Sequence, residues 1–152
     1  MQVSDIRIEF VHIRPGDLEA VCRIDSATFP SPWPVEYFRD ALADNRVLCM
    51  GIVVQEQLVA YALGFIEGAC FHLSSMAVAP PHRRHGMGEK LLRYVLNQAF
   101  QRGCVRSRLE VREGNVAAQS LYQKIGFVQR NSMANYYEGP REDGLEMELD
   151  LA

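Results

Sequence analysis

Residues 78–92 read Val-Ala-Pro-Pro-His-Arg-Arg-His-Gly-Met-Gly-Glu-Lys-Leu-Leu, and this stretch indicates the fold more strongly than any other part of the chain. An apolar strand leads into a basic loop, and the loop leads into an amphipathic helix. The start of a helix gathers free backbone N–H groups and the positive end of the helix dipole. Gly86 and Gly88 let the main chain approach a ligand closely, while Arg83 and Arg84 add positive charge. The segment therefore predicts a pyrophosphate-binding site.

This loop differs from the common nucleotide-binding loops. A Walker loop ends in Gly-Lys-Ser/Thr, whereas Lys90 follows Glu89 and precedes Leu91. A dinucleotide fingerprint needs a third glycine, which is missing here. For this segment alone, the simpler alternative is an ordinary strand-to-helix turn whose arginines lie in solvent.

The bulk composition is that of one globular domain. The chain has 152 residues, of which 48% are hydrophobic and 23% are charged. Residues 1–152 are therefore expected to form a single domain with a sizeable core. The formal net charge of −3 argues against a general affinity for nucleic acid. Basic residues concentrate locally between His82 and Arg93, so any anion site is expected to be local.

Cysteine usage and the N-terminus indicate a reducing compartment. The cysteines lie far apart, with no Cys-x-x-Cys pair and no histidine at metal-ligand spacing: Cys22, Cys49, Cys70 and Cys104. We expect free, mostly buried thiols and no metal site. Residues 1–5 do not begin a signal peptide, and no apolar run approaches the length of a membrane span. The protein is expected to be cytoplasmic, without membrane contact.

Hydrophobic periodicity predicts the order of helices and strands. Strands are expected at 6–13, 47–54, 58–66, 70–78, 106–112, about 127–133 and 145–151, and helices from residue 17, at 35–43, 88–102 and 115–125. A polar turn at 138–144 is expected between the last two strands. This order predicts an α/β (α+β) fold, in which helices cover both faces of a mixed, mostly antiparallel sheet of about seven strands.

A second motif, at residues 109–127, reads LEVRxxNxxAxxLYxxxGF. Together with the glycine loop, it resembles the core of the GNAT acetyltransferases, whose acetyl-CoA loop is Gln/Arg-x-x-Gly-x-Gly/Ala after a strand ending in Val-x-Pro. Residues 29–33 and 135–137 resemble the RimI-type branch, which acetylates protein N-termini. The chain departs from that branch at residues 71–76, a strand that helps to line the acceptor site in the family.

The resemblance implies acetyl-CoA as the acetyl-donor cosubstrate. The family's splayed strand before the loop would expose N–H groups near Ala77 and Val78 to polarise the thioester carbonyl, and a local bulge would free such donors. Asn115 matches a residue that touches the pantetheine arm, although it could equally be a helix N-cap. The cofactor residues implied in this way are Met76, Ala77, Val78, Arg83, Arg84, His85, Gly86, Met87, Gly88 and Asn115.

Two residues of the second motif are implied to be catalytic. Glu110 matches the position of a general base, directly or through a water, whereas its alternative is a surface glutamate paired with Arg108 or Arg112. Tyr122 matches the acid that protonates the departing thiolate, whereas its alternative is a packing tyrosine.

Aromatic residues near both ends of the chain are candidates for the acceptor site. The walls would be formed by Phe29, Pro30, Trp33, Tyr136 and Tyr137, which could alternatively form a lid over the core. The expected partner is a protein N-terminus, with a ribosomal protein as the leading candidate, and the protein is expected to be a monomer or weak dimer. Two alternatives remain open. One is acetylation of a small amine, attracted by the acidic residues of the 138–144 turn, and the other is a non-catalytic, CoA-binding regulatory module.

Overall fold

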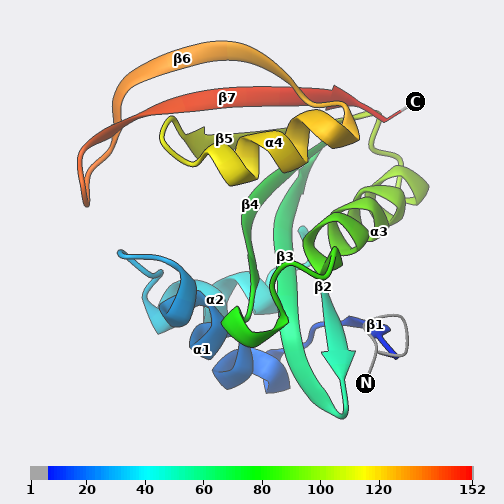
Figure 1. Cartoon of the computed structure of the whole chain (residues 1–152). Helices are drawn as coiled ribbons and strands as arrows, with labels where there is room; N and C mark the ends of the chain where they lie inside the picture. The colour runs from blue at the N-terminus through cyan, green and yellow to red at the C-terminus, as the bar shows by residue number, and fades with distance from the viewer. Residues whose placement is uncertain (1–6, 152) are drawn as a thin grey trace.

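The structure, a computed structural model, describes residues 7–151 and consists of a seven-stranded sheet with four α-helices (Figure 1). The strands are β1 (Glu9–His12), β2 (Val47–Val54), β3 (Gln57–Glu67), β4 (Cys70–Val78), β5 (Arg106–Arg112), β6 (Val128–Tyr137) and β7 (Glu142–Asp150). The helices are α1 (Leu18–Thr28), α2 (Val35–Ala43), α3 (Met87–Gln101) and α4 (Val116–Ile125), with short 3-10 turns at Pro15–Asp17 and Pro80–His82.

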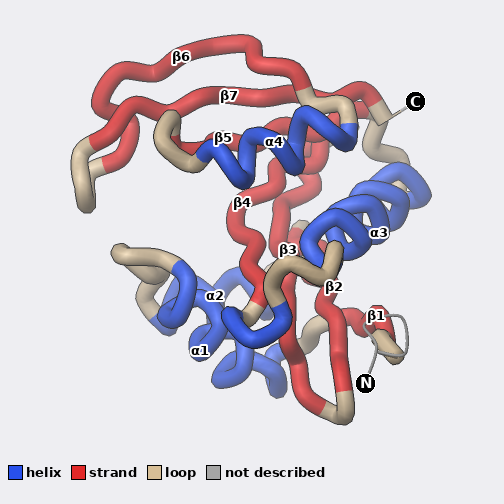
Figure 2. The backbone as a smooth tube through the Cα atoms, in the orientation of Figure 1, coloured by secondary structure: helices blue, strands red, loops and turns tan. Residues whose placement is uncertain are grey.

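The sheet is mixed and mostly antiparallel, as the sequence predicts. Its strand order is β1-β2-β3-β4-β5-β7-β6, and only the central neighbours β4 and β5 run parallel. A parallel pair needs a crossover connection, and α3 supplies it. Figure 2 shows the strands as a continuous curved layer with helices on either side of it.

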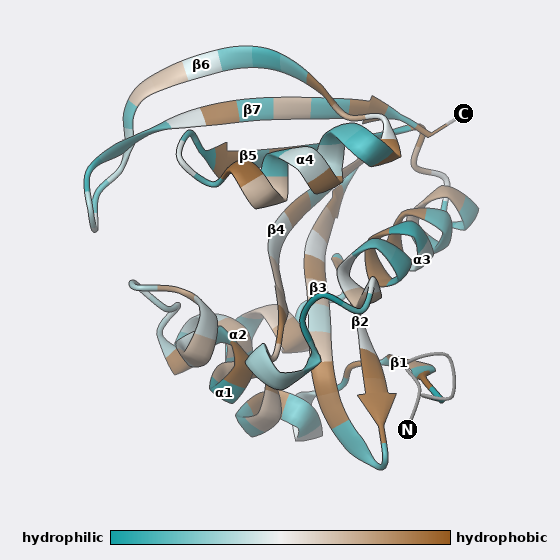
Figure 3. Ribbon diagram, in the orientation of Figure 1, coloured by the Kyte–Doolittle hydropathy of each residue, from teal (hydrophilic) through white to brown (hydrophobic). Residues whose placement is uncertain are grey.

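Each face of the sheet carries its own hydrophobic core, so the predicted two-sided packing is confirmed. On one face, α3 buries a stripe that includes Leu91, Leu92 and Val95 against β2, β3 and β4, and α4 packs on the same side. On the other face, α1 and α2 bury Ile24 and Phe38 against β2 and β3. Figure 3 shows the hydrophobic stripe of α3 turned toward the sheet.

Most predicted boundaries agree with the structure to within one residue, and the larger differences lie at the two ends. The bounds of α2, β2, β4 and β5 agree to the residue. In the first predicted strand, residue 6 lies outside the described residues, and the observed strand is shorter than predicted. A turn does lie between the last two strands, but it covers residues 138–141 and not 138–144, because β7 begins at Glu142, which pairs with Tyr137 of β6. Because β6 is an edge strand with mostly exposed side chains, it lacks the alternating pattern that would reveal its length.

The parallel strands β4 and β5 pair over only three residues and then separate. The register joins Cys70, Phe71 and His72 to the first half of β5, and no pair follows. A bulge lies just beyond this point, since Gly64 pairs with Leu73 whereas Leu63 pairs with Ser75. The extra residue, Ser74, reverses the alternation of β4. As a result Leu73 packs in the α3-side core, whereas Ala77 packs on the α1 side.

All four cysteines are free thiols, and three of them are buried: Cys49, Cys70 and Cys104. Within residues 7–151, none of the helices has the length and apolar character that a bilayer crossing requires.

Candidate active site

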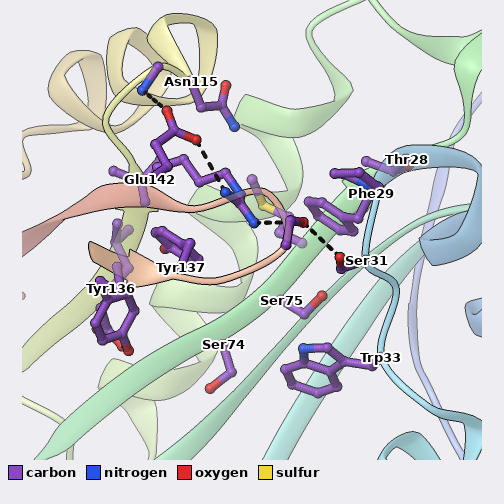
Figure 4. Close-up of a pocket in the computed structure, with 18 of the residues that line it drawn as sticks. Thr28, Phe29, Ser31, Trp33, Ser74, Ser75, Asn115, Tyr136, Tyr137 and Glu142 are labelled. Carbon is purple, nitrogen blue, oxygen red and sulfur yellow. Dashed lines mark hydrogen bonds and ion pairs between the residues drawn. The ribbon is translucent and has the colours of Figure 1, made fainter. Parts of the chain in front are cut away.

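A cleft of about 750 Å³ opens where β4 and β5 separate. It extends between the α1–α2 loop and the β6–β7 turn, whose side chains face each other across it (Figure 4). Many of the residues predicted from the sequence line this one cleft: Phe29, Pro30, Trp33, Met76, Glu110, Asn115, Tyr122, Tyr136 and Tyr137. Ala77, Val78 and the loop from Arg83 to Gly88 do not line it, and they lie further along β4 and at the start of α3.

The unpaired edge of β4 presents backbone donors to the space between the strands. The N–H of Ala79 donates to the carbonyl oxygen of Val59 on β3 at 2.7 Å. Backbone groups alternate between the two edges of a strand, so the N–H of Ala77 also points toward β3. The N–H groups of Met76 and Val78 point the other way, toward β5, which no longer pairs there. The geometry therefore favours Met76 and Val78, rather than Ala77, as donors to a carbonyl oxygen.

The glycine loop has the backbone of an anion-binding turn. Arg84 and Gly86 both adopt the left-handed conformation, with φ of 67° and 75°. Gly86 is the N-cap of α3, and no side chain caps the first N–H groups of this helix. Nearby left-handed residues at a helix start direct backbone N–H groups to one side, where the helix dipole adds positive potential. A Cβ added at Gly86 would meet nothing within 4 Å, so the constraint at this position is conformational.

Two predicted cofactor residues have their side chains engaged within the protein. Arg83 donates from Nε to the carbonyl oxygen of Val78 at 2.8 Å and from Nη2 to Oγ1 of Thr28 at 2.9 Å. It therefore connects the loop to β4 and α1. The side chain of Met87 is buried in the α3-side core, so only its backbone can serve a ligand. Arg84 is exposed and His85 is half-exposed, which leaves them as the mobile donors of the loop.

Glu110 lies on β5 and is held by several partners. Its two carboxylate oxygens lie 2.9 and 3.1 Å from Nε2 of His72, and Tyr136 donates its hydroxyl to Oε1 at 3.4 Å. Nη1 of Arg108 lies 3.6 Å from Oε2. Burial alone would raise the pKa of Glu110, but the hydrogen bond and charge of His72 and the charge of Arg108 outweigh it, so the pKa is lowered. The carboxylate is therefore ionised and faces the cleft.

Tyr122 combines the packing position with a hydroxyl that faces the cleft. Its ring packs against Phe127 with ring centroids 5.8 Å apart and lines the cleft. Within residues 7–151, every fully buried side-chain polar atom has a hydrogen-bond partner, and Tyr122 donates to none, so its hydroxyl is not sealed in the core. Burial raises its pKa to about 12. The phenol therefore keeps its proton at neutral pH, as a proton donor must.

Asn115 is an N-cap that also borders the cleft. Its side-chain oxygen accepts a 3.2 Å hydrogen bond from the N–H of Ala118, as the N-cap interpretation predicts. Because it also lines the cleft, the two roles considered from the sequence are compatible.

A buried carboxylate positions one wall of the cleft. Asp25 is 1% exposed, accepts the backbone N–H of Trp33 at 2.9 Å, and accepts the hydroxyl of Tyr61 at 2.8 Å. Tyr61 in turn contacts Oγ of Ser75 on β4 at 2.7 Å. Trp33 also packs on Phe38 with ring centroids 5.0 Å apart. The indole is therefore both part of the lid over the α1-side core and a wall of the cleft.

Arg112 stabilises the opposite wall of the cleft, which the β6–β7 turn forms. It contacts Oε1 of Glu142 at 3.2 Å, donates to the carbonyl oxygen of Pro140 at 2.7 Å, and lies over the ring of Tyr137, 4.4 Å from its centroid. The other carboxylate oxygen of Glu142 accepts the N–H of Gly114 at 2.6 Å. These contacts hold the β6–β7 turn above the cleft, as the dashed lines in Figure 4 show.

The acidic residues near the last turn are mostly engaged with the protein itself. Glu142 pairs with Arg112, and Asp143 accepts the backbone N–H of Asn135 at 2.8 Å. Of Glu138, Glu142 and Asp143, only Glu138 lines the cleft without a side-chain hydrogen bond or ion pair to another residue within 7–151. This arrangement weakens the small-amine alternative.

Sequence reasoning missed several residues that shape the site, above all His72, Asp25 and Arg112. The departure of residues 71–76 from the family pattern was the one available signal for His72. The contacts of Asp25 and Arg112 join residues far apart in the chain, such as Asp25 and Tyr61. Hydrophobic periodicity describes only neighbouring residues, so it could not predict these contacts.

Comparison with known proteins agrees with this geometry. Residues 18–127 match the Acetyltransferase (GNAT) family. The chain is 30% identical over 138 residues to a protein of Salmonella typhimurium named ribosomal protein bS18-alanine N-acetyltransferase, covering 90% of this chain and 93% of that protein.

Solved structures show the same fold. The Escherichia coli ribosomal-protein-S18-alanine N-acetyltransferase superposes with a TM-score of 0.91 at 28% identity, covering 96% of this chain and 95% of that one. Ard1 from Thermoplasma volcanium, at 23% identity, has a TM-score of 0.87 with coverage of 95% and 98% and supports the fold alone. With a glycine loop at a helix start, a splayed central strand pair and a matching family core, the chain belongs to the GNAT family of acetyltransferases.

Proposed function

We propose that this N-acetyltransferase transfers the acetyl group of acetyl-CoA to the α-amino group of a protein N-terminus, with a ribosomal protein as the acceptor. The observation that carries the proposal is the cleft at the β4–β5 separation, which is lined by the Glu110 carboxylate, the protonated Tyr122 and Met76 of the unpaired edge of β4. The names of the Salmonella and E. coli relatives support the acceptor class. We expect residues 1–152 to act as one domain in the cytoplasm.

The chain offers a fitting site for acetyl-CoA, which supplies an activated thioester. The left-handed loop before α3, with Arg84 and Gly86, would hold the pyrophosphate. The free N–H groups of Met76 and Val78 would hydrogen-bond the carbonyl oxygen of the thioester. Backbone donors aimed at a developing oxyanion stabilise it by about 3 kcal/mol.

Glu110 would remove the proton from the acceptor amine. An α-amino group titrates near pKa ~8, against ~10.4 for a lysine side chain, so it needs only mild help to become a nucleophile at neutral pH. The lowered pKa of Glu110 keeps it ionised and makes it a weak base. A weak base suits the α-amine better than lysine, and transfer through one water extends its reach.

Tyr122 would complete the transfer. When the amine nitrogen bonds to the carbonyl carbon and the carbon–sulfur bond breaks, the sulfur leaves as a thiolate. The Tyr122 hydroxyl lies in the same cleft, is protonated, and can give its proton to that sulfur. A thiol of pKa ~8.5 is a tolerable leaving group, so this assistance is modest.

The aromatic walls favour an extended peptide as acceptor. Phe29 and Trp33 lie on one side of the cleft and Tyr136 and Tyr137 on the other. Aromatic walls of this kind fit the first residues of a chain, whereas two of the acidic groups that would retain a polyamine, Glu142 and Asp143, are engaged by Arg112 and Asn135.

The proposal can be tested by incubating the protein with acetyl-CoA and a library of short peptides and small amines, followed by mass spectrometry. Acetylation of peptide α-amines supports it. Acetylation only of lysine side chains, polyamines or aminoglycosides would replace it with the small-amine function. Acetyl-CoA binding without acetylation of any amine would favour a regulatory CoA-binding module.

A further inference from the structure

The candidate base, Glu110, forms a hydrogen bond with a histidine that does not line the cleft. Nε2 of His72 lies 2.9 and 3.1 Å from the two oxygens of Glu110, so one ring nitrogen bridges the carboxylate. The side chains of His72 and Glu110 are only 20% and 13% exposed. A contact this sheltered from water restricts the carboxylate to one orientation.

A second carboxylate, that of Glu67, lies near the other nitrogen of the histidine ring. Nδ1 of His72 lies 3.7 Å from Oε1 of Glu67, at the end of β3. Arg108 completes a ring, with Nη2 at 3.1 Å from Glu67 and Nη1 at 3.6 Å from Glu110. The imidazole therefore lies between two carboxylates that Arg108 also contacts.

His72 occupies the point at which the two central strands part. It is the last residue of β4 that pairs with β5, opposite Arg108, and Glu110 is the next side chain on the same face of β5. The contact therefore spans the closed end of the separation between the strands. Beyond it lies the bulge at Ser74, which turns the rest of β4 toward the cleft.

We propose that His72 is a positioning residue for acetyl transfer, which holds the Glu110 carboxylate at the closed end of the β4–β5 separation so that it faces the acceptor amine. This inference rests on the proposed function, because it assigns a role toward the base of that reaction. His72 acts through Glu110 and does not touch the acceptor.

The charged and titratable groups that face the pair come from β3, β5, β6 and β7: Glu67, Arg108, Tyr136 and Glu146, which pairs across the sheet with Glu110.

Two variants separate positioning from simple packing. His72→Leu fills a similar volume without a hydrogen-bond donor, whereas His72→Gln keeps an N–H donor that cannot titrate. We expect kcat to fall roughly ten- to hundredfold in His72→Leu, with the KM for acetyl-CoA unchanged, and most of the loss to be recovered in His72→Gln. His12→Gln, at the far edge of the sheet, is the matched control.

A second measurement does not depend on turnover. The ¹⁵N chemical shift of His72 Nε2, compared at one pH between the wild type and Glu110→Gln, should differ if this nitrogen donates its proton to the Glu110 carboxylate. An unchanged chemical shift, or equal kcat in the wild type and His72→Leu, overturns the inference. If the wild-type protein acetylates no peptide, the proposed function fails, and the resonance shift still decides whether the two residues are coupled.

Discussion

The hydroxyl of Ser31 donates a 2.7 Å hydrogen bond to the carbonyl oxygen of Gly139. The bond joins the α1–α2 loop to the β6–β7 turn across the top of the cleft (Figure 4). Because Arg112 also donates to the carbonyl oxygen of Gly139, at 3.3 Å, the two walls of the cleft share one attachment point.

Replacing Ser31 with alanine should weaken acceptor binding and leave the donor site intact. Loss of one hydrogen bond costs about 1 kcal/mol, which corresponds to roughly a fivefold rise in the KM for the peptide. Steady-state kinetics with the peptide and acetyl-CoA varied in turn would measure this. Ser26→Ala, on the exposed side of α1, is the matched control, and an equal rise in both KM values would contradict a local effect.

Replacing Glu110 with glutamine should remove the base while keeping a side chain of the same shape. We expect kcat to fall roughly a hundredfold, with the affinity for acetyl-CoA unchanged by calorimetry. Glu9→Gln, an exposed strand glutamate far from the cleft, serves as the control. Unchanged turnover in Glu110→Gln would show that Glu110 is not the base and serves only in its ion pairs.

Replacing Tyr122 with phenylalanine should lower kcat roughly tenfold, because the ring packing is preserved and only the proton donor is lost. The pKa of about 12 also predicts that wild-type turnover does not decline through Tyr122 ionisation below about pH 10. Both are measured by kcat–pH profiles, with Tyr94→Phe as control because that ring stacks on Phe10 away from the cleft. Nearly normal turnover in Tyr122→Phe would assign it to packing alone.

Replacing Gly86 with alanine should weaken acetyl-CoA binding. The φ of 75° is costly for a residue with a side chain, by about 1–2 kcal/mol, and relaxation of the loop would turn its N–H groups away from the pyrophosphate. A loss of roughly tenfold in affinity is expected by calorimetry. Gly16→Ala is a close control, since a Cβ there also meets open space and its φ is not positive.

Asp25 should make the fold less stable as the pH rises. Burial raises its pKa, and the hydrogen bonds from Tyr61 and Trp33 only partly offset this. The folded protein therefore binds the Asp25 proton more tightly than the unfolded chain does, so stability from this group is present at low pH. It is lost as the pH rises from about 4 through the folded-state value.

The measurement for Asp25 is the free energy of unfolding by urea at several pH values. Relative to the wild type, Asp25→Asn should gain stability as the pH rises, with Asp40→Asn on the exposed side of α2 as the control for losing a carboxylate. A constant difference across pH would contradict the assignment.

Local patterns predicted the elements that have one buried face. The alternation of Leu109 and Val111 with Arg108 and Glu110 identified β5 to the residue, because one side of that strand contacts the core. The edge strand β6 has mostly exposed side chains, so its sequence does not alternate between apolar and polar residues. Tertiary pairing of Tyr137 with Glu142 sets the length of the hairpin instead.

The bulge on β4 explains why the faces occupied by the second half of this strand could not be predicted. Strict alternation places residues 72, 74 and 76 on one face of the strand, and the extra residue at Ser74 breaks that rule. The partner strand β5 follows only after α3, so the meeting of His72 and Glu110 depends on a crossover and a register that no local pattern encodes.

The sequence by itself determined the loop before α3, because two glycines, a preceding strand and a following amphipathic helix are properties of neighbouring residues. Only the tertiary structure decided that Glu110, Tyr122 and the aromatic walls share one cleft. The physical reason is the short pairing of β4 with β5, which ends at His72 and leaves the strands to diverge. Backbone donors, carboxylate and phenol meet in the space that this divergence opens.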